Sequence, residues 1–141
     1  MKKIFTVVIL FISTLIYSQS EFKSTISFIT ANNSIISAYN DFNYYMEYQQ
    51  TESLSNDGQY KLITIDLKDK EKVIFVKDRR GNFVAVYVMF PNKDEYLQFL
   101  YKTLDDKFNY TKENTWINLD NNNVYYLDFK GSVCVLFVKS E

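Results

Sequence analysis

Apolar and polar residues follow each other in a pattern that predicts β-hairpins in two parts of the chain. In the first part, the turn "DRRGN" (78–82) separates the runs "KVIFV" and "FVAVYVMF", and Gly81 supplies the positive φ that such turns require. In the second part, "FKGSV" places Gly131 between "VYYLDF" and "VCVLFV". Polar turns at 67–72 and 120–123 add the runs "KLITIDL" and "TWINL". The pattern therefore predicts two three-stranded meanders.

A segment with apolar residues at helical spacing lies between the two meanders. Pro91 ends the last strand of the first meander, and Asn92 with Glu95 three residues later is typical of a helix N-cap. We expect a helix from about Lys93 to Lys107. The apolar residues that recur at helical spacing are Tyr96, Phe99, Leu100, Thr103 and Leu104.

A second helical stripe precedes the first meander and includes "YNDFNYYMEYQQ" (39–50). Asn33 or Ser34 is a suitable N-cap for this helix. Tyr44 and Tyr48 fall outside the stripe. The segment "FKSTISFITA" (22–31) fits either a strand or a short helix, and we favour the helix. At 100° per residue, the stripe consists of Ile35, Ala38, Tyr39, Phe42, Tyr45 and Met46.

The order helix, three strands, helix, three strands predicts an α+β fold. Tandem helix-plus-three-strand-meander units would form an antiparallel sheet with helices packed on one face. We interpret the units, residues 34–90 and 92–139, as an internal duplication of pattern within a single domain, residues 21–141. The strand at 83–90 is apolar on both parities, so it needs cover on both sheet faces unless one face is a binding surface. Two helices cover one face, and the other face becomes the main functional question.

The first twenty residues have the layout of a secretory signal peptide. Lys2 and Lys3 precede an apolar run over 4–17, and small polar residues follow. The run is short for a membrane span, although an uncleaved N-terminal anchor is the alternative. We therefore expect a signal peptide over residues 1–20, no transmembrane segment after its removal, and a periplasmic or secreted protein. Cys134 is the single cysteine, so we expect neither a lipoprotein nor an internal disulfide.

Charge and composition exclude several functions. The formal net charge is −1, and without Lys2 and Lys3 the 14 basic and 17 acidic residues leave −3, which argues against nucleic-acid binding. The chain has no histidine, which removes His-based catalytic dyads and triads and His-ligated metals. Cys134 has apolar neighbours and is interpreted as a buried residue. We predict no catalytic residue, cofactor or metal.

Four kinds of residue remain as candidates for chemistry or binding. Trp116 is either core or an interface hot spot. Arg79 and Arg80 in "KDRR" form either a solvated turn or a contact for an anion or an acidic partner. The rings of Tyr44 and Tyr48 are either scattered surface aromatics or part of a binding surface. An enzyme would need two facing carboxylates, for which the strand residues Asp66 and Asp128 are the candidates.

These observations favour a small exported soluble binding module that uses a ring-rich sheet face. Its partner would be a protein or an apolar small ligand. One alternative is an enzyme that uses carboxylates and tyrosine without histidine. Another is a self-associating structural subunit of the cell envelope, with "VCVLFVKSE" at the C-terminus as the exposed edge strand. The oligomeric state stays open.

Overall fold

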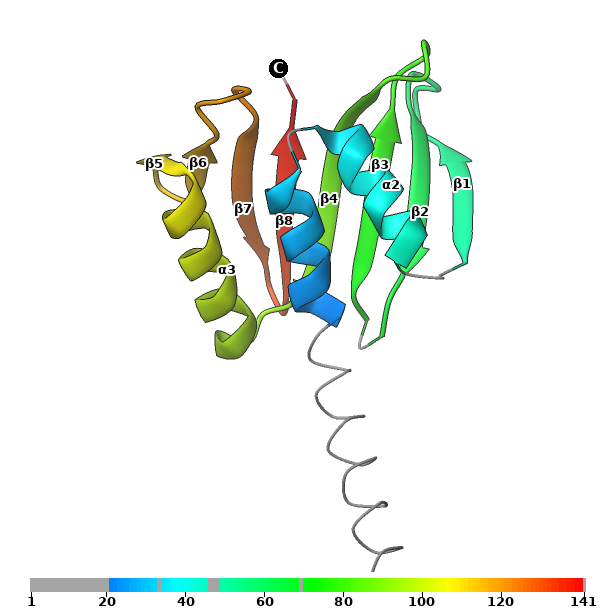
Figure 1. Ribbon diagram of the computed structural model, residues 1–141. Helices are drawn as coiled ribbons and strands as arrows, with labels where there is room; N and C mark the ends of the chain where they lie inside the picture. Colours follow the sequence, from blue (N-terminus) through cyan, green and yellow to red (C-terminus); the bar gives the residue numbers. More distant parts are fainter. Residues whose placement is uncertain (1–20, 33, 46–48, 69, 141) are drawn as a thin grey trace, which may run out of the picture.

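The chain forms an α+β fold, as the sequence predicts. The computed structural model describes residues 21–32, 34–45, 49–68 and 70–140, and within them three helical segments pack on an eight-stranded antiparallel sheet (Figure 1). The helical segments are residues 21–31, α2 (Ile35–Tyr45) and α3 (Asp94–Lys107). All three lie on the same face of the sheet (Figure 1). The segment at 22–31 is thus a helix, as we favoured.

The sheet has the strand order β1-β2-β3-β4-β8-β7-β6-β5. Each half is a meander, and the halves join where β4 pairs antiparallel with β8. The strands are β1 (Gln50–Leu54), β2 (Lys61–Asp66), β3 (Lys72–Lys77), β4 (Phe83–Pro91), β5 (Asn109–Lys112), β6 (Thr115–Ile117), β7 (Val124–Lys130) and β8 (Val133–Lys139).

Each meander has four strands rather than the predicted three. The additional strands, β1 with the sequence "QTESL" and β5 with the sequence "NYTK", lie at the two edges of the sheet. Every residue in both strands is exposed. An edge strand of this kind has no apolar alternation, because it contributes little to the core, and hydrophobic periodicity cannot detect it.

The C-terminal strand is not an edge strand, so this part of the self-association hypothesis is wrong. β8 lies in the centre of the sheet between β4 and β7. Its residues are alternately buried and half-buried until Lys139. A run that is apolar on both parities is typical of a central strand, and this rule would have placed β8 correctly.

The core lies between the sheet and the helical layer and is rich in aromatic rings. Phe22 of the first helical segment lies 5.0 Å from Phe90 of β4, measured between ring centroids. Tyr39 of α2 lies 5.1 Å from Phe75 of β3. Most of the apolar stripe predicted in α2 therefore faces the sheet. Its members Ile35, Ala38 and Phe42 are buried, whereas Met46 is outside the described residues.

The two predicted N-caps have different outcomes. Ser34 precedes α2, and its hydroxyl oxygen accepts a hydrogen bond from the backbone N–H of Ser37 at 3.2 Å, which confirms Ser34 as a cap. The Asn92 cap is wrong. Lys93 directly precedes α3 and makes no side-chain capping bond. The backbone N–H of Asn92 instead donates to the carbonyl oxygen of Ser132 at 2.9 Å, because the β7–β8 turn lies beside it.

Candidate functional site

The sheet face opposite the helices is covered by no described helix, and we call it the open face (Figure 1). Residues paired across antiparallel strands point to the same side of a sheet, so the register assigns its members. Most of them are half-buried and apolar. The apolar side chains assigned to the open face are Leu62, Ile74, Val76, Ala85, Tyr87, Met89, Ile117, Val124, Tyr126, Val133, Val135 and Phe137.

Three aromatic residues form the centre of the open face. Tyr87 of β4 pairs with Phe137 of β8, which pairs with Tyr126 of β7. The rings of Tyr87 and Phe137 have centroids 4.7 Å apart and are inclined by 32°. Tyr87 remains 36% exposed and Tyr126 42% exposed. The row continues to Ile74 on β3, which makes an apolar band across four adjacent strands.

A shallow hollow of about 620 Å³ lies beside the middle of this band, against Tyr87 and Phe137. Its lining includes Tyr60, Leu62, Tyr87, Phe137 and Lys139. The hollow is wide open to solvent. Sites for small molecules bury most of their ligand in a concave cavity, and this shape does not do so.

The carboxylates of the open face do not form a catalytic pair. Asp66 and Asp128 belong to one cross-strand row that passes through Lys72, Met89 and Val135. Four strand spacings of ~4.8 Å place their backbones about 19 Å apart. A glycosidase-type pair requires a separation of about 5–10 Å. The geometry therefore gives no support to the carboxylate enzyme.

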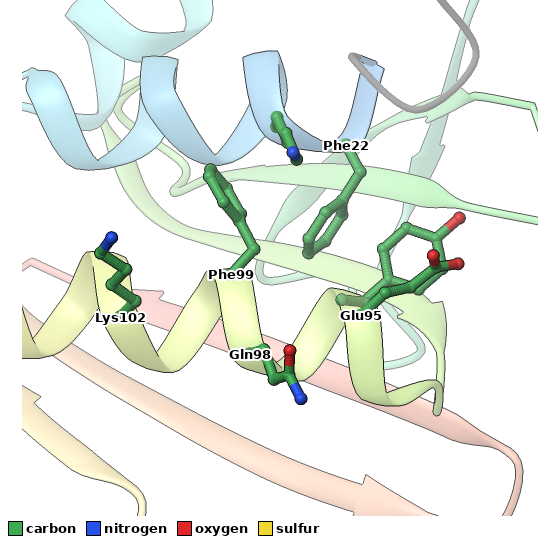
Figure 2. A pocket seen from close by; sticks show the side chains of 7 residues that line it. Phe22, Glu95, Gln98, Phe99 and Lys102 are labelled. Atoms are coloured by element: carbon green, nitrogen blue, oxygen red, sulfur yellow. The ribbon is translucent and has the colours of Figure 1, made fainter. Parts of the chain in front are cut away.

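A second hollow, of about 300 Å³, lies between the first helical segment and α3. Figure 2 shows Phe22 and Phe99 facing each other across it, with Lys102 and Glu95 at its rim. The Phe22 and Phe99 ring centroids are 6.2 Å apart, and the Lys23 Nζ lies 5.4 Å from the centroid of Phe99. These rings already pack on each other and on the core, so the hollow is a seam in the helical layer.

The buried polar groups do not form an active site. Burial raises the pKa of the Cys134 thiol, which keeps the sulfur protonated and unreactive at neutral pH. Burial also raises the pKa of Tyr125 to about 12, an effect that nearby Asn118 offsets in part. Among the described residues, no group of three or more acidic or cysteine side chains could hold a metal ion. No described helix is long and apolar enough to cross a membrane.

The structure places Trp116 in the core rather than at a surface. Its side chain is 0% exposed, and its Nε1–H donates to Asp105 Oδ1 at 2.8 Å. The rings of Tyr101 and Tyr110 pack against it at centroid distances of 5.7 and 5.6 Å. The core interpretation of Trp116 fits this position, and the hot-spot interpretation does not.

The other predicted site residues are not brought together. Tyr44 on α2 is 79% exposed on the helical side of the molecule, and Tyr48 lies outside the described residues. Arg79 and Arg80 are exposed in the β3–β4 turn. In that turn, backbone N–H groups of Asn82 and Arg80 bond Asp78 and hold the pKa of its carboxyl below the ordinary value. The Asp78 carboxylate thus has its hydrogen-bond partners within the turn itself.

Residue-by-residue reading of the sequence missed Tyr87, Tyr126 and Phe137 as candidate site residues. The available signal was the second apolar parity of strands such as 83–90, which indicated an unexplained face without selecting these rings. Comparison with known proteins adds no further candidate: no protein-family model matches the chain, and neither the curated proteins nor the solved structures give a significant match.

Proposed function

We propose that the protein is a binding module that docks its open face onto a protein partner. The observation that carries this proposal is the apolar band of Ile74, Tyr87, Phe137 and Tyr126, which runs across four strands and is left uncovered by every described helix. Contiguous exposed apolar patches of this kind are rare on monomeric proteins and mark interaction sites.

The dimensions of the open face favour a protein over a small ligand. At ~3.3 Å per residue and ~4.8 Å between strands, the eight strands cover roughly 750 Å². A stable protein interface buries about 800 Å² on each partner. The face is also broad and shallow, whereas small ligands require a concave pocket. Its composition, with Tyr and Phe at the centre, is typical of an interface core.

We further propose that the module acts outside the cytoplasm, in a periplasm or as a secreted protein. The support is the basic, apolar and small-residue order of residues 1–20. Cys134 is buried and free. The fold therefore needs no disulfide, which is compatible with export of a protein that has one cysteine.

The experiment compares two variants in a pull-down from the native envelope and medium. The face variant is Tyr87→Thr/Phe137→Thr, which keeps β-forming residues but removes both rings. The control variant is Tyr44→Ser, which removes a more exposed ring from the helical side. We expect the wild-type protein and the control to capture the same protein, and the face variant to lose it.

The captured protein must then bind the purified wild-type protein directly, with an affinity at least about 100-fold lower for the face variant, a loss that two interface rings can account for. Circular dichroism and urea unfolding confirm that the face variant is folded. Equal capture by the folded face variant and the wild-type protein would overturn the proposal. Loss of capture with Tyr44→Ser alone would move the site to α2.

A further inference from the structure

We infer that the partner's complementary surface is acidic, with an apolar anchor surrounded by carboxylates. This inference rests on the proposed function and deepens it. It comes from the charges that the strand register places around Tyr126 and Phe137, which belong to the half of the sheet formed by β5 to β8.

The open face carries more lysines than carboxylates. In one half of the sheet, Lys72 forms an ion pair with Asp66, at 3.6 Å between Nζ and Oδ1. These two charges neutralise each other. The other half carries one carboxylate, Asp128, and three exposed lysines, which are Lys112, Lys130 and Lys139.

The three lysines lie on three sides of the Tyr126–Phe137 pair. Lys139 follows Phe137 by two residues on β8, and Lys130 lies at the opposite end of β7. Lys112 lies on β5, beyond the partner of Tyr126 on β6. At ~4.8 Å between strands and ~6.6 Å between same-face residues, each lysine backbone is about 7–15 Å from the nearer ring-bearing residue. A partner that covers these rings must therefore approach the lysines.

The three lysines form no ion pair within the described part of the chain, although Asp78 lines the same hollow as Lys139. The ion pairs among the described residues join Lys61 to Glu52, Lys68 to Glu21 and Lys72 to Asp66, and none involves Lys112, Lys130 or Lys139. The nearby Asp128 carboxylate accepts a hydrogen bond from the backbone N–H of Phe129 at 2.9 Å. This local excess of positive charge occurs on a chain whose formal net charge is −1.

Electrostatic complementarity makes an acidic partner the favoured occupant. Matching charges around an apolar centre steer association and exclude wrong partners. A second copy of the chain is a disfavoured partner. If two open faces met with their lysine-rich halves in contact, the lysines would repel each other. If each lysine-rich half met the other half of the sheet, the lysine charges would be desolvated without counter-charges. An acidic rim supplies the missing counter-charges.

The test uses a phage-displayed library of loop sequences on a neutral β-sandwich scaffold as the probe. Binders selected on the purified protein are sequenced and then measured against a charge-reversal variant, Lys112→Glu/Lys130→Glu/Lys139→Glu. The matched control, Lys23→Glu/Lys93→Glu/Lys102→Glu, makes the same change in net charge at exposed lysines on the helical side.

We expect face-directed binders to combine aromatic or aliphatic residues with an excess of Asp and Glu. The charge-reversal variant should weaken their binding about tenfold or more, because three attractive rim charges become repulsive. The control variant should change binding less than about threefold. Raising the salt concentration should weaken the wild-type complex and not that of the charge-reversal variant.

Each other outcome overturns a specific part of the account. Neutral or basic binders that need Phe137 but tolerate charge reversal would refute the acidic partner and leave the binding face intact. Binders that tolerate the loss of both Tyr87 and Phe137 would refute the binding face itself. Vesicles with 30% phosphatidylglycerol serve as a second probe: tight binding that needs the same three lysines would assign the face to a membrane instead of a protein.

Discussion

The two faces of the sheet are made by the same strands, and both are largely apolar, yet they are organised differently. On β8, Leu136 points to the covered face and is 0% exposed, whereas its neighbour Phe137 points to the open face and is half-buried. The covered face is explained by the helices, since its rings contact rings of the helical layer. The open face has no such cover among the described residues. Folding therefore accounts for one apolar face, and a binding function is our explanation for the other.

The largest expected effect is the difference in unfolding free energy lost when a side chain is removed from the covered face or from the open face. Leu136→Ala should lower the free energy of unfolding by about 2–5 kcal/mol, because it leaves a cavity in a packed core. Phe137→Thr removes a larger side chain but should cost at most about 1–2 kcal/mol, since the ring is partly solvated and Thr favours strands. Urea denaturation followed by circular dichroism measures both values. Equal losses would mean that the open face is packed like a core.

The second expected effect concerns Trp116 and tests whether this residue belongs to the core on the covered face. Trp116→Phe should lower the free energy of unfolding by about 2–3 kcal/mol, because it removes buried volume and the hydrogen bond to Asp105. Asp105→Asn keeps an acceptor oxygen and should cost less than about 1 kcal/mol. Thermal unfolding gives the comparison. A fully stable Trp116→Phe variant with impaired partner binding would return Trp116 to the list of interface residues.

The smallest effect at neutral pH is expected at Tyr125, on the covered face. Its buried hydroxyl makes no hydrogen bond of ordinary geometry to a described residue, although Asn118 lies near it. Tyr125→Phe should therefore change the free energy of unfolding at pH 7 by no more than about 1 kcal/mol, with a gain as the favoured sign. A loss above about 2 kcal/mol would show that the hydroxyl has a strong partner.

The same variant should have a larger effect at alkaline pH. The pKa of Tyr125 is raised from 10.0 to about 12 in the folded protein, so the folded state holds its proton where the unfolded state loses it. The contribution of this group to stability is complete below pH 10 and is lost as the pH rises towards 12. Between pH 8 and pH 12, the free energy of unfolding should therefore fall less steeply with pH for Tyr125→Phe than for the wild-type protein. Identical slopes would contradict the raised pKa.

The sequence predicts the central part of this fold well and its periphery poorly. Gly81 and Gly131 identify the two tight hairpins, and both have positive φ values, of 85° and 65°. The apolar spacing of 93–107 identifies α3 to within one residue. The edge strands β1 and β5 escape detection because their exposed residues have no hydrophobic period. The cap at Asn92 fails because the helix begins one residue later and the Asn92 side-chain amide donates to the carbonyl oxygen of Gly131, at 3.4 Å, in the neighbouring turn.

The candidate site was predictable as a face but not as residues. The two-sided apolar pattern of 83–90 indicates that a surface needs cover. The register that joins Tyr87 to Phe137 and Tyr126 depends on the pairing of β4 with β8 across the two halves. These residues are up to about fifty positions apart in the chain, and no local pattern specifies that long-range pairing. An exposed aromatic residue within one helix, such as Tyr44, is identified by helical periodicity alone, and Tyr44 is a predicted binding residue for that reason.

Tyrosine footprinting of the complex tests the central claim most directly. The protein is acetylated with N-acetylimidazole, alone and with its captured partner, and the modified tyrosines are identified by mass spectrometry. We expect Tyr87 and Tyr126 to react in the free protein and to be protected in the complex, with Tyr44 equally reactive in both and Tyr125 unreactive throughout. Protection of Tyr44 in the complex, with Tyr87 and Tyr126 still reactive, would contradict the assignment of binding to the open face.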